Sequence, residues 1–303
     1  MKDFGVLVPI VTPCGESGDV DYEGLSNVCE DMIDAGCSGI FVAGSTGRGP
    51  WFSLEDRKKI CARVSEITSK KGIPLFAGCM ASGIEDMLEN SRAMREVGAD
   101  YSVITSPGYF IYNHREIEEI FLRYSQESPL PVLLYDIPVF TGMKLDFGMV
   151  KRLSKQDNII GFKDSSADIG RFNELNNYFE SRDDFMVLQG KEHLLLESLK
   201  GGASGFVVGL VHIQPKPFIN LYEAYIRGDV DKAQQLQANI ITVMELVKDC
   251  FVKRPETSTL FHFLNYCLKE RAVCRNIMMP FEGDCPENIK ESAHEALTIL
   301  NDV

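Results

Sequence analysis

The sequence predicts a single (β/α)8 barrel (a TIM barrel) with a C-terminal helical extension. Short apolar runs alternate with longer amphipathic segments, and the alternation repeats eight times at a spacing of about 30 residues. The chain has 303 residues, 45% hydrophobic and 25% charged, as in an ordinary globular protein. This length would also fit two domains, but α/β barrels commonly reach about 250 residues as one domain. A doubly wound open sheet is the main alternative, and it rarely needs eight such units.

Eight short segments are predicted strands, because they are rich in Val, Ile and Phe and too short for helices. They are residues 5–11, 39–43, 74–78, 101–105, 132–135, 159–163, 185–188 and 205–208. Between them, Ser53 followed by two acidic residues begins one helix, and Asn113 with Glu116 begins another. Further helices are predicted near residues 21–35, 84–97, 168–180, 191–200 and 215–227, with a short one near 146–154.

The strand signal stops after Gly228. The rest of the chain has a helical pattern, clearest over residues 233–247, 258–268 and 289–300. We therefore divide the chain into a barrel, residues 1–228, and a helical extension, residues 229–303. The extension is expected to pack on the barrel and could support an oligomer.

The net charge excludes several kinds of partner. The chain has 31 Lys and Arg against 44 Asp and Glu, a formal charge of −13. Nucleic acids and anionic membranes require a basic surface, and no block of Lys or Arg provides one locally. No stretch approaches 18 uninterrupted apolar residues, and the N-terminus lacks the pattern of a signal peptide. We expect a cytoplasmic protein that binds neither nucleic acid nor membrane.

Neither cysteines nor histidines indicate a disulfide framework or a metal site. The nine cysteines are an odd number without a C-x-x-C pair, so we expect reduced thiols, mostly in the core. The five histidines lie on separate segments without the spacing of metal ligands, and we expect each at the surface or at a helix cap. They are His114, His193, His212, His262 and His294.

In a barrel of this kind the active site lies at the carboxyl ends of the strands. The residues at these ends are Gly44 to Gly49 after the second strand, Ser106, Pro107 and Tyr109 after the fourth, Tyr135 in the fifth, Lys163 to Ser165 in the sixth, and Gly190, Glu192 and Gly209 after the last two.

Lys163 is the sharpest candidate in this set. A lysine that closes an apolar strand is partly desolvated, which lowers its pKa and increases the neutral amine that a Schiff base requires. The alternative is a lysine that leaves the strand to meet solvent or to pair with Asp164. Tyr135 and Tyr109 could move a proton beside a lysine imine, although tyrosines at strand ends often only pack. The loop Gly-Ser-Thr-Gly-Arg-Gly at 44–49 could bind an anion through its backbone, or form only a tight turn.

Together these motifs resemble the dihydrodipicolinate synthase / N-acetylneuraminate lyase family of pyruvate-dependent class I aldolases. The match comprises the G-S-T-G loop at 44–47, Ser106-Pro107 with Tyr109, the Y-D-I-P run from Tyr135, and the G-F-K-D-S run around Lys163. Order and spacing agree over roughly residues 4–228, and four motifs in register are far more specific than one.

The resemblance implies a mechanism without cofactor or metal. Lys163 would form a covalent imine with pyruvate or another 2-keto acid, which reacts with or releases an aldehyde. Tyr135 would transfer the proton, and Ser45 would connect it to Tyr109 of a neighbouring subunit, as in family tetramers. The other substrate-binding residues expected are Thr46, which with Ser45 holds the carboxylate, and Ser165, Gly190, Glu192, Val207 and Gly209. A homo-oligomer, tetramer or dimer, is therefore expected.

Departures from the family pattern bear on the substrate. Dihydrodipicolinate synthases usually carry Glu where Arg48 stands, and Arg where Phe140 stands, to bind the carboxylate of aspartate semialdehyde. Gly108 replaces a tyrosine that commonly closes the lysine-feedback site. The loop at 44–50 looks like the 2-keto-3-deoxygluconate aldolase branch, in which the position of Glu192 is commonly Asp and contacts sugar hydroxyls.

The leading hypothesis is cleavage of a 2-keto-3-deoxy sugar acid to pyruvate and an aldehyde. Dihydrodipicolinate synthase is the alternative within the enzyme class, and N-acetylneuraminate lyase is another. From a different class, the barrel could be a non-catalytic 2-keto-acid binding protein, although a binder has no need of a neutral lysine.

Overall fold

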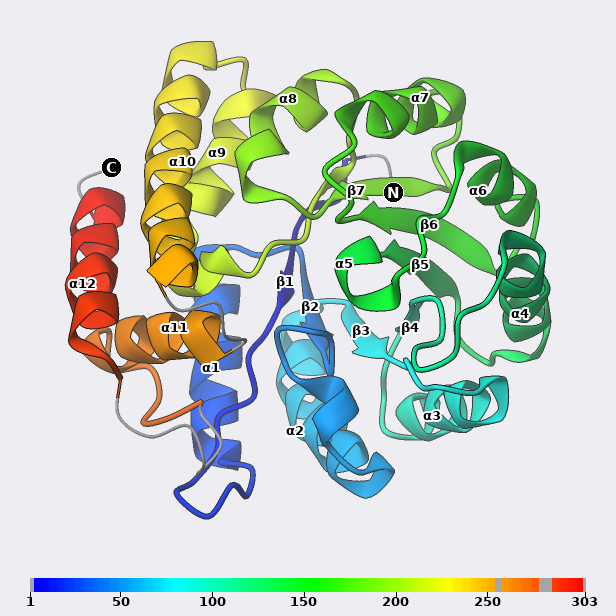
Figure 1. Ribbon diagram of the computed structural model, residues 1–303, viewed down its shortest axis with the longest axis horizontal. Coiled ribbons are helices and arrows are strands. Elements are labelled where there is room, and N and C mark those ends of the chain that lie inside the picture. The colour runs from blue at the N-terminus through cyan, green and yellow to red at the C-terminus, as the bar shows by residue number, and fades with distance from the viewer. Residues whose placement is uncertain (1–2, 254–257, 278–284, 302–303) are drawn as a thin grey trace.

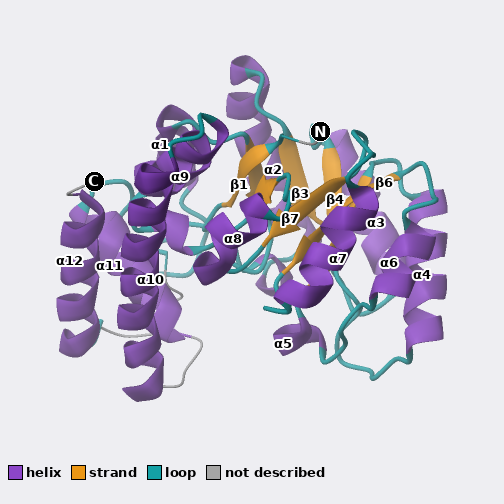
Figure 2. Ribbon diagram, turned by 90° about the horizontal axis from the view of Figure 1, so that it is seen from above, coloured by secondary structure: helices purple, strands orange, loops and turns teal. Residues whose placement is uncertain are grey.

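The computed structural model describes residues 3–253, 258–277 and 285–301 and confirms the predicted barrel (Figure 1). Eight parallel strands close in sequence order, with β8 paired to β1, and Figure 2 shows helices enclosing them. The strands are β1 (Gly5–Pro9), β2 (Gly39–Val42), β3 (Leu75–Gly78), β4 (Tyr101–Ile104), β5 (Val132–Asp136), β6 (Ile159–Asp164), β7 (Met186–Gln189) and β8 (Gly205–Phe206).

Side chains at the helix ends satisfy backbone groups that the helices leave free. Ser53 accepts a hydrogen bond from the backbone N–H of Asp56, and Asn113 with Glu116 forms a complete capping box, as predicted. The barrel helices are α1 (Tyr22–Ala35), α2 (Leu54–Lys71), α3 (Ile84–Glu96), α4 (His114–Glu127), α5 (Pro138–Thr141), α6 (Phe147–Leu153), α7 (Ile169–Phe179), α8 (Leu195–Lys200) and α9 (Pro215–Ile226).

Three helices follow the barrel: α10 (Val230–Lys253), α11 (Ser258–Glu270) and α12 (Glu287–Asn301). The first packs along α9, and α12 packs against both α10 and α11, which places the three on one flank of the barrel (Figure 1). Within the described part of the chain, no helix is long and apolar enough to cross a membrane.

Two connections at the carboxyl end of the barrel differ from the predicted elements. The short helix α5 was not predicted; Pro138 sets the backbone of its first turn, and Gly142 ends it in a left-handed conformation. The predicted helix at 191–200 is divided into a 3-10 turn, Glu192–Leu194, and α8.

The division of this helix has a physical cause in the extension. In a continuous α-helix the N–H of Leu196 would bond to the carbonyl of Glu192. Gln237 of α10 inserts its amide between them: its Nε2 donates to the Glu192 carbonyl at 2.9 Å, and its Oε1 accepts from the Leu196 N–H at 2.8 Å. The extension therefore determines the backbone conformation at Glu192.

The cysteines follow the prediction and two histidines do not. All nine cysteines are free, and all but the half-buried Cys285 are buried, which confirms core thiols. The expectation that each histidine lies at the surface or at a cap is wrong for His212 and His262, which are buried. Burial lowers the pKa of His212 to about 4, and its Nε2 lies 3.1 Å from the Pro9 carbonyl oxygen, so a neutral ring fits among apolar neighbours.

Closure of the barrel between β8 and β1 depends on a glycine at position 205. Its φ is 150°, and a Cβ added there would lie 1.9 Å from the carbonyl oxygen of Gly5. We expect Gly205→Ala to lower the free energy of unfolding by about 3 kcal/mol. Overpacking costs about 1–3 kcal/mol, and the upper end applies because the added Cβ meets backbone atoms, which cannot move aside as a side chain can. Denaturant unfolding measures this difference.

The matched control is Gly83→Ala, because a Cβ at Gly83 meets no heavy atom within 4 Å. Its expected effect stays within about 0.5 kcal/mol. Equal losses of unfolding free energy in the two variants would show that a steric clash at position 205 is not the cause.

Candidate active site

Lys163 lies at the end of β6 and is only 4% exposed. Its Nζ is 3.8 Å from the ring centroid of Tyr135 and 5.5 Å from that of Phe41. Burial lowers the pKa of Lys163 to about 7; the negative charge of Glu192 opposes this shift and the positive charge of Lys191 adds to it. A substantial fraction of the amine is therefore neutral near pH 7.

Both alternatives for Lys163 are wrong. The side chain does not meet solvent, because it is buried. It does not pair with Asp164 either: successive side chains of a strand point to opposite faces, and the Asp164 carboxylate pairs with Arg171 of α7, 2.6 Å from its Nη2.

Tyr135 is the register partner of Lys163 on β5 and is also 4% exposed. Burial raises the pKa of Tyr135 to about 12, while hydrogen bonding with the hydroxyls of Ser165 and Ser45 acts in the opposite direction. The phenol is therefore neutral at physiological pH and connected to two hydroxyls. The structure thus brings together four of the predicted residues: Lys163, Tyr135, Ser45 and Ser165.

The loops after β2, β6, β7 and β8 meet around this centre. Thr46 lies beside Gly209, where an added Cβ would be 3.4 Å from the Thr46 Oγ1. Ser165 Oγ donates to the Gly190 carbonyl at 3.4 Å, and a Cβ at Gly190 would meet that hydroxyl at 2.1 Å. Val207 is buried in the same apolar cluster as Tyr135. The loops after β2 and β8 therefore meet at Thr46 and Gly209, and those after β6 and β7 meet at Ser165 and Gly190.

Glu192 is half-buried, and its carboxylate accepts a 3.4 Å hydrogen bond from the backbone N–H of Leu210. Its negative charge acts to raise the pKa of both Lys163 and Tyr135. The neighbouring Lys191 also acts on Lys163 and was missed from the sequence. Its position two residues after the seventh strand was the signal that could have indicated it.

Arg48 faces away from this centre. Its Nη2 donates to the carbonyl of Thr12 at 2.6 Å, and its guanidinium lies 5.7 Å from the ring of Trp51 and 5.3 Å from that of Phe261 on α11. The guanidinium is therefore a structural link between the loop after β2 and the extension. An anion at this loop would be bound by Ser45, Thr46 and backbone N–H groups.

Tyr109 stands apart from the other predicted residues within one chain. It lies on the loop between β4 and α4, is 90% exposed, and has a φ of 78°, which is unfavourable for a residue other than glycine. Its ring packs edge-on against Phe110, with centroids 4.9 Å apart, and Phe110 is itself exposed. A side chain this exposed cannot be buried against Tyr135 of the same chain.

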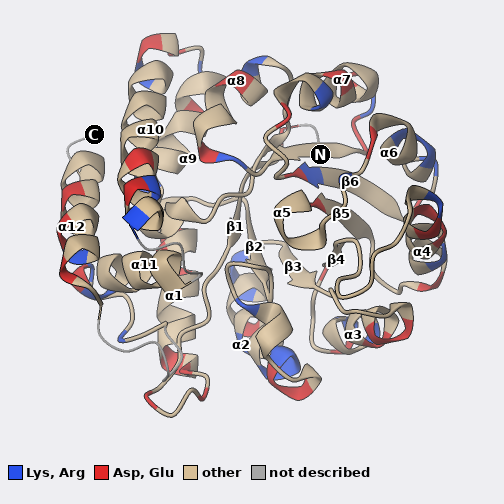
Figure 3. Ribbon diagram, in the orientation of Figure 1, with Lys and Arg blue, Asp and Glu red and all other residues tan. Residues whose placement is uncertain are grey.

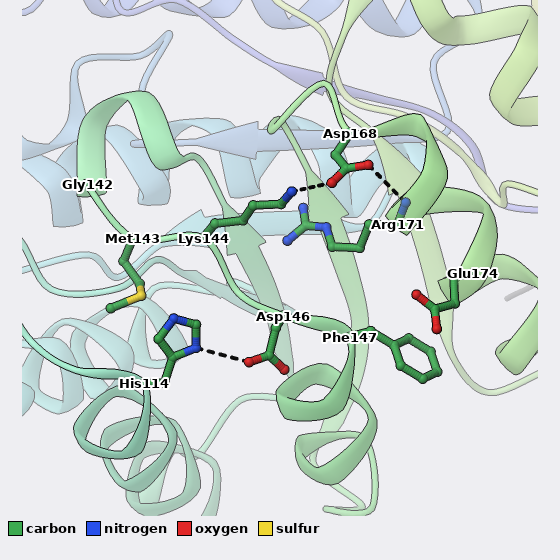
Figure 4. A pocket seen from close by; sticks show the side chains of 9 residues that line it. All are labelled: His114, Gly142, Met143, Lys144, Asp146, Phe147, Asp168, Arg171 and Glu174. Carbon is green, nitrogen blue, oxygen red and sulfur yellow. Dashed lines mark hydrogen bonds and ion pairs between the residues drawn. The ribbon is translucent and has the colours of Figure 1, made fainter.

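A surface pocket of about 550 Å³ lies outside the barrel rim, beside the first turns of α4, α6 and α7 (Figure 4). Its charged groups largely pair with one another: Lys144 with Asp168, and His114 with Asp146 at 3.0 Å. Arg171 forms part of the same wall. Acidic and basic residues are likewise interspersed on the outer helices in Figure 3. Unlike the buried centre around Lys163 and Tyr135, this pocket lies among exposed side chains that pair with one another.

A (β/α)8 barrel with a buried lysine against a buried tyrosine, on adjacent strands at their carboxyl ends, has the arrangement of an aldolase. The chain belongs to the dihydrodipicolinate synthetase family, whose profile matches residues 2–296.

Proteins of known function support this family assignment. The chain is 29% identical over 232 residues to 4-hydroxy-tetrahydrodipicolinate synthase of Methanothrix thermoacetophila, covering 77% of each chain. It is 28% identical over 241 residues to the enzyme of that name from Neisseria meningitidis serogroup B, covering 80% of this chain and 82% of that one.

Solved structures show the same fold. Dihydrodipicolinate synthase from Thermotoga maritima superposes with a TM-score of 0.89 at 22% identity, covering 100% of both chains. CdNal from Clostridium difficile, solved in complex with mannosamine, superposes with a TM-score of 0.87 at 18% identity, covering 97% of this chain and 98% of that one.

The resemblance found in the sequence is confirmed. The chain is an aldolase-type lyase of the dihydrodipicolinate synthetase family.

Proposed function

We propose that the chain is a Schiff-base aldolase in which Lys163 forms an imine with pyruvate or another 2-keto acid. The supporting observation is a buried lysine with a pKa of about 7 whose amine lies against the ring of Tyr135. The neutral amine adds to the ketone carbon, and loss of water leaves a protonated imine. This cation accepts electrons as the bond between C3 and C4 breaks, so the chemistry needs neither metal nor other cofactor.

Tyr135 moves the proton in this proposal. As the C3–C4 bond breaks, the hydroxyl on C4 becomes the aldehyde and gives its proton to the Tyr135 oxygen, while Tyr135 passes its own proton to the hydroxyl of Ser45 or Ser165, which passes on the proton that it held. One proton then returns along this relay through Tyr135 to C3 of the enamine. Water adds to the imine that forms, which releases pyruvate and the amine of Lys163. Thr46 and Ser45 hold the carboxylate, and the substrate lies against Ser165, Gly190, Val207 and Gly209.

The proton relay is completed by Tyr109 of a second copy of the chain. Tyr109 cannot reach Tyr135 within its own chain, but its exposed ring and the exposed Phe110 and Ile111 beside it form an apolar surface on which two copies could meet. We therefore propose a dimer or tetramer as the active form.

For the substrate we propose a 2-keto-3-deoxy sugar acid. Phe140 stands on α5 with its ring exposed, where an arginine would bind the carboxylate of aspartate semialdehyde. The charge of Glu192 acts on Lys163, and its carboxylate offers acceptors for sugar hydroxyls. Dihydrodipicolinate synthase is the second candidate, because the relatives carry that name.

Borohydride reduction in the presence of pyruvate tests the chemistry. We expect a stable adduct of pyruvate mass on Lys163, and a protein without it would not be a Schiff-base aldolase. Condensation of pyruvate with glyceraldehyde, N-acetylmannosamine and aspartate semialdehyde then tests the substrate. Glyceraldehyde is expected to turn over fastest; a comparable rate with aspartate semialdehyde would overturn our interpretation of Phe140. An adduct without turnover of any aldehyde would instead indicate a binding protein.

A further inference from the structure

The two strands that carry the reactive side chains are joined on their outer face. In the register of β5 and β6, Tyr135 is opposite Lys163 and Asp136 is opposite Asp164. Because side chains alternate along a strand, the first pair points into the barrel and the second toward the helices. Both aspartates are about 1% exposed, so each carboxylate requires a partner within the protein.

That partner is Arg171 on α7. Its Nη1 lies 2.6 Å from the Asp136 Oδ2 and its Nη2 lies 2.6 Å from the Asp164 Oδ2, so one guanidinium spans both strands. Nη1 also donates to the Leu145 carbonyl, and Nη2 donates to the Ser166 hydroxyl at 2.9 Å. The arginine side chain is 6% exposed.

The aspartates are fixed from their other side as well. Asp136 Oδ1 accepts from the backbone N–H of Leu145 at 3.3 Å, and Asp164 Oδ1 accepts from that of Ser166 at 2.7 Å. Burial raises the pKa of Asp136 to about 6 despite the contact with Arg171. A planar guanidinium binds two acceptors in a fixed geometry, whereas an ammonium is a single point charge.

We propose that Arg171 is a positioning residue that bridges Asp136 and Asp164 and so holds the amine of Lys163 against the ring of Tyr135. This inference rests on the proposed Schiff-base function. Each bridged aspartate is the chain neighbour of one reactive residue, so a shift of one strand end moves that residue directly. Misplacement of a reacting group by about 1 Å costs about 100-fold in rate. A loosened strand edge also admits water to Lys163, and its pKa then moves up toward the ordinary value.

Two variants test this proposal. Arg171→Lys keeps the charge but pairs with one carboxylate at a time. The triple variant Asp136→Asn, Asp164→Asn, Arg171→Met removes the bridge without leaving an uncompensated buried charge, which protects folding. The control is Arg182→Lys, because Arg182 pairs with Asp184 at 2.6 Å on the loop before β7, at the opposite end of the barrel from the rim.

The readouts are kcat, the KM for pyruvate, and the pH at which borohydride trapping on Lys163 is half-maximal. We expect kcat to fall roughly 10- to 100-fold in the triple variant and less in Arg171→Lys, with KM changed little. The half-maximal pH should rise above the wild-type value in both variants. Arg182→Lys should match the wild type.

Failure of the positioning role of Arg171 and failure of the proposed function give different results. A wild-type protein without an adduct would contradict the proposed function. An adduct in the wild type, with a melting temperature lowered in the variants but kcat and the trapping pH unchanged, would overturn the positioning role of Arg171 and leave the proposed function intact.

Discussion

Lys163→Met is expected to abolish the pyruvate adduct and to reduce turnover by at least about 1,000-fold, because loss of a covalent nucleophile removes the main route through the reaction. Methionine fills a similar space without an amine, so the barrel interior around Phe41 and Tyr135 stays packed. Trapping with labelled pyruvate and steady-state kinetics measure the two effects. The control is Lys58→Met, which removes a surface lysine paired with Glu96 at 3.1 Å. This variant should retain both the pyruvate adduct and the turnover.

The same variant has a pH signature in its stability. Burial lowers the pKa of Lys163 from 10.5 to about 7, so between these values the unfolded chain holds a proton that the folded protein has released. The free energy of unfolding of the wild type therefore rises with pH across this window. Lys163→Met lacks this dependence and should be more stable below pH 7, by up to about 5 kcal/mol at roughly 1.4 kcal/mol per pKa unit. The difference should vanish toward pH 10.5; a difference independent of pH would contradict the buried, neutral amine.

Tyr135→Phe is expected to lower kcat by about 100- to 10,000-fold while the pyruvate adduct on Lys163 still forms. The ring remains against the lysine, so the apolar surroundings that lower its pKa are kept. Only the hydroxyl that exchanges the substrate proton is removed. Separate measurements of turnover and of trapping distinguish these two stages.

Tyr124→Phe is the matched control for this variant. Tyr124 on α4 is fully buried in the apolar layer between the strands and the surrounding helices. Its hydroxyl is therefore remote from the rim. It should leave turnover near the wild-type value. If trapping in Tyr135→Phe falls as far as turnover does, the hydroxyl is needed for imine formation itself, and our assignment of its role to bond cleavage would be wrong.

The architecture was predictable because its signals are local. A short apolar run around Phe41 identifies one strand. Ser53, followed by apolar residues at helical spacing, identifies one helix, and neither assignment requires knowledge of the rest of the chain. Eight repeats of this unit limit the topology to very few choices, and the topology places all carboxyl strand ends at one rim. Lys163 and Tyr135 could therefore be located before any contact was known.

Contacts between distant segments were not predictable in this way. Arg171 is one of many charged residues on an amphipathic helix, and only the register of β5 with β6 brings two aspartates to it. Gln237 lies far along the chain from Glu192, so nothing in either neighbourhood indicates that they bond. Tyr109 is a further case, because its expected neighbours belong to another copy of the chain.

The bond between Gln237 and Glu192 also has a consequence for engineering and for the divergence of such enzymes. The extension reaches the catalytic rim at two points, at Glu192 through Gln237 and at the loop after β2 through Phe261 and Arg48. A chimera that exchanged only the last helices would therefore replace the contacts that support Glu192 and the loop after β2, although every rim residue stayed the same. For the same reason, excision of the eight-stranded core would remove the contacts to both loops, and libraries aimed at new substrates should vary α10 and α11 together with the rim.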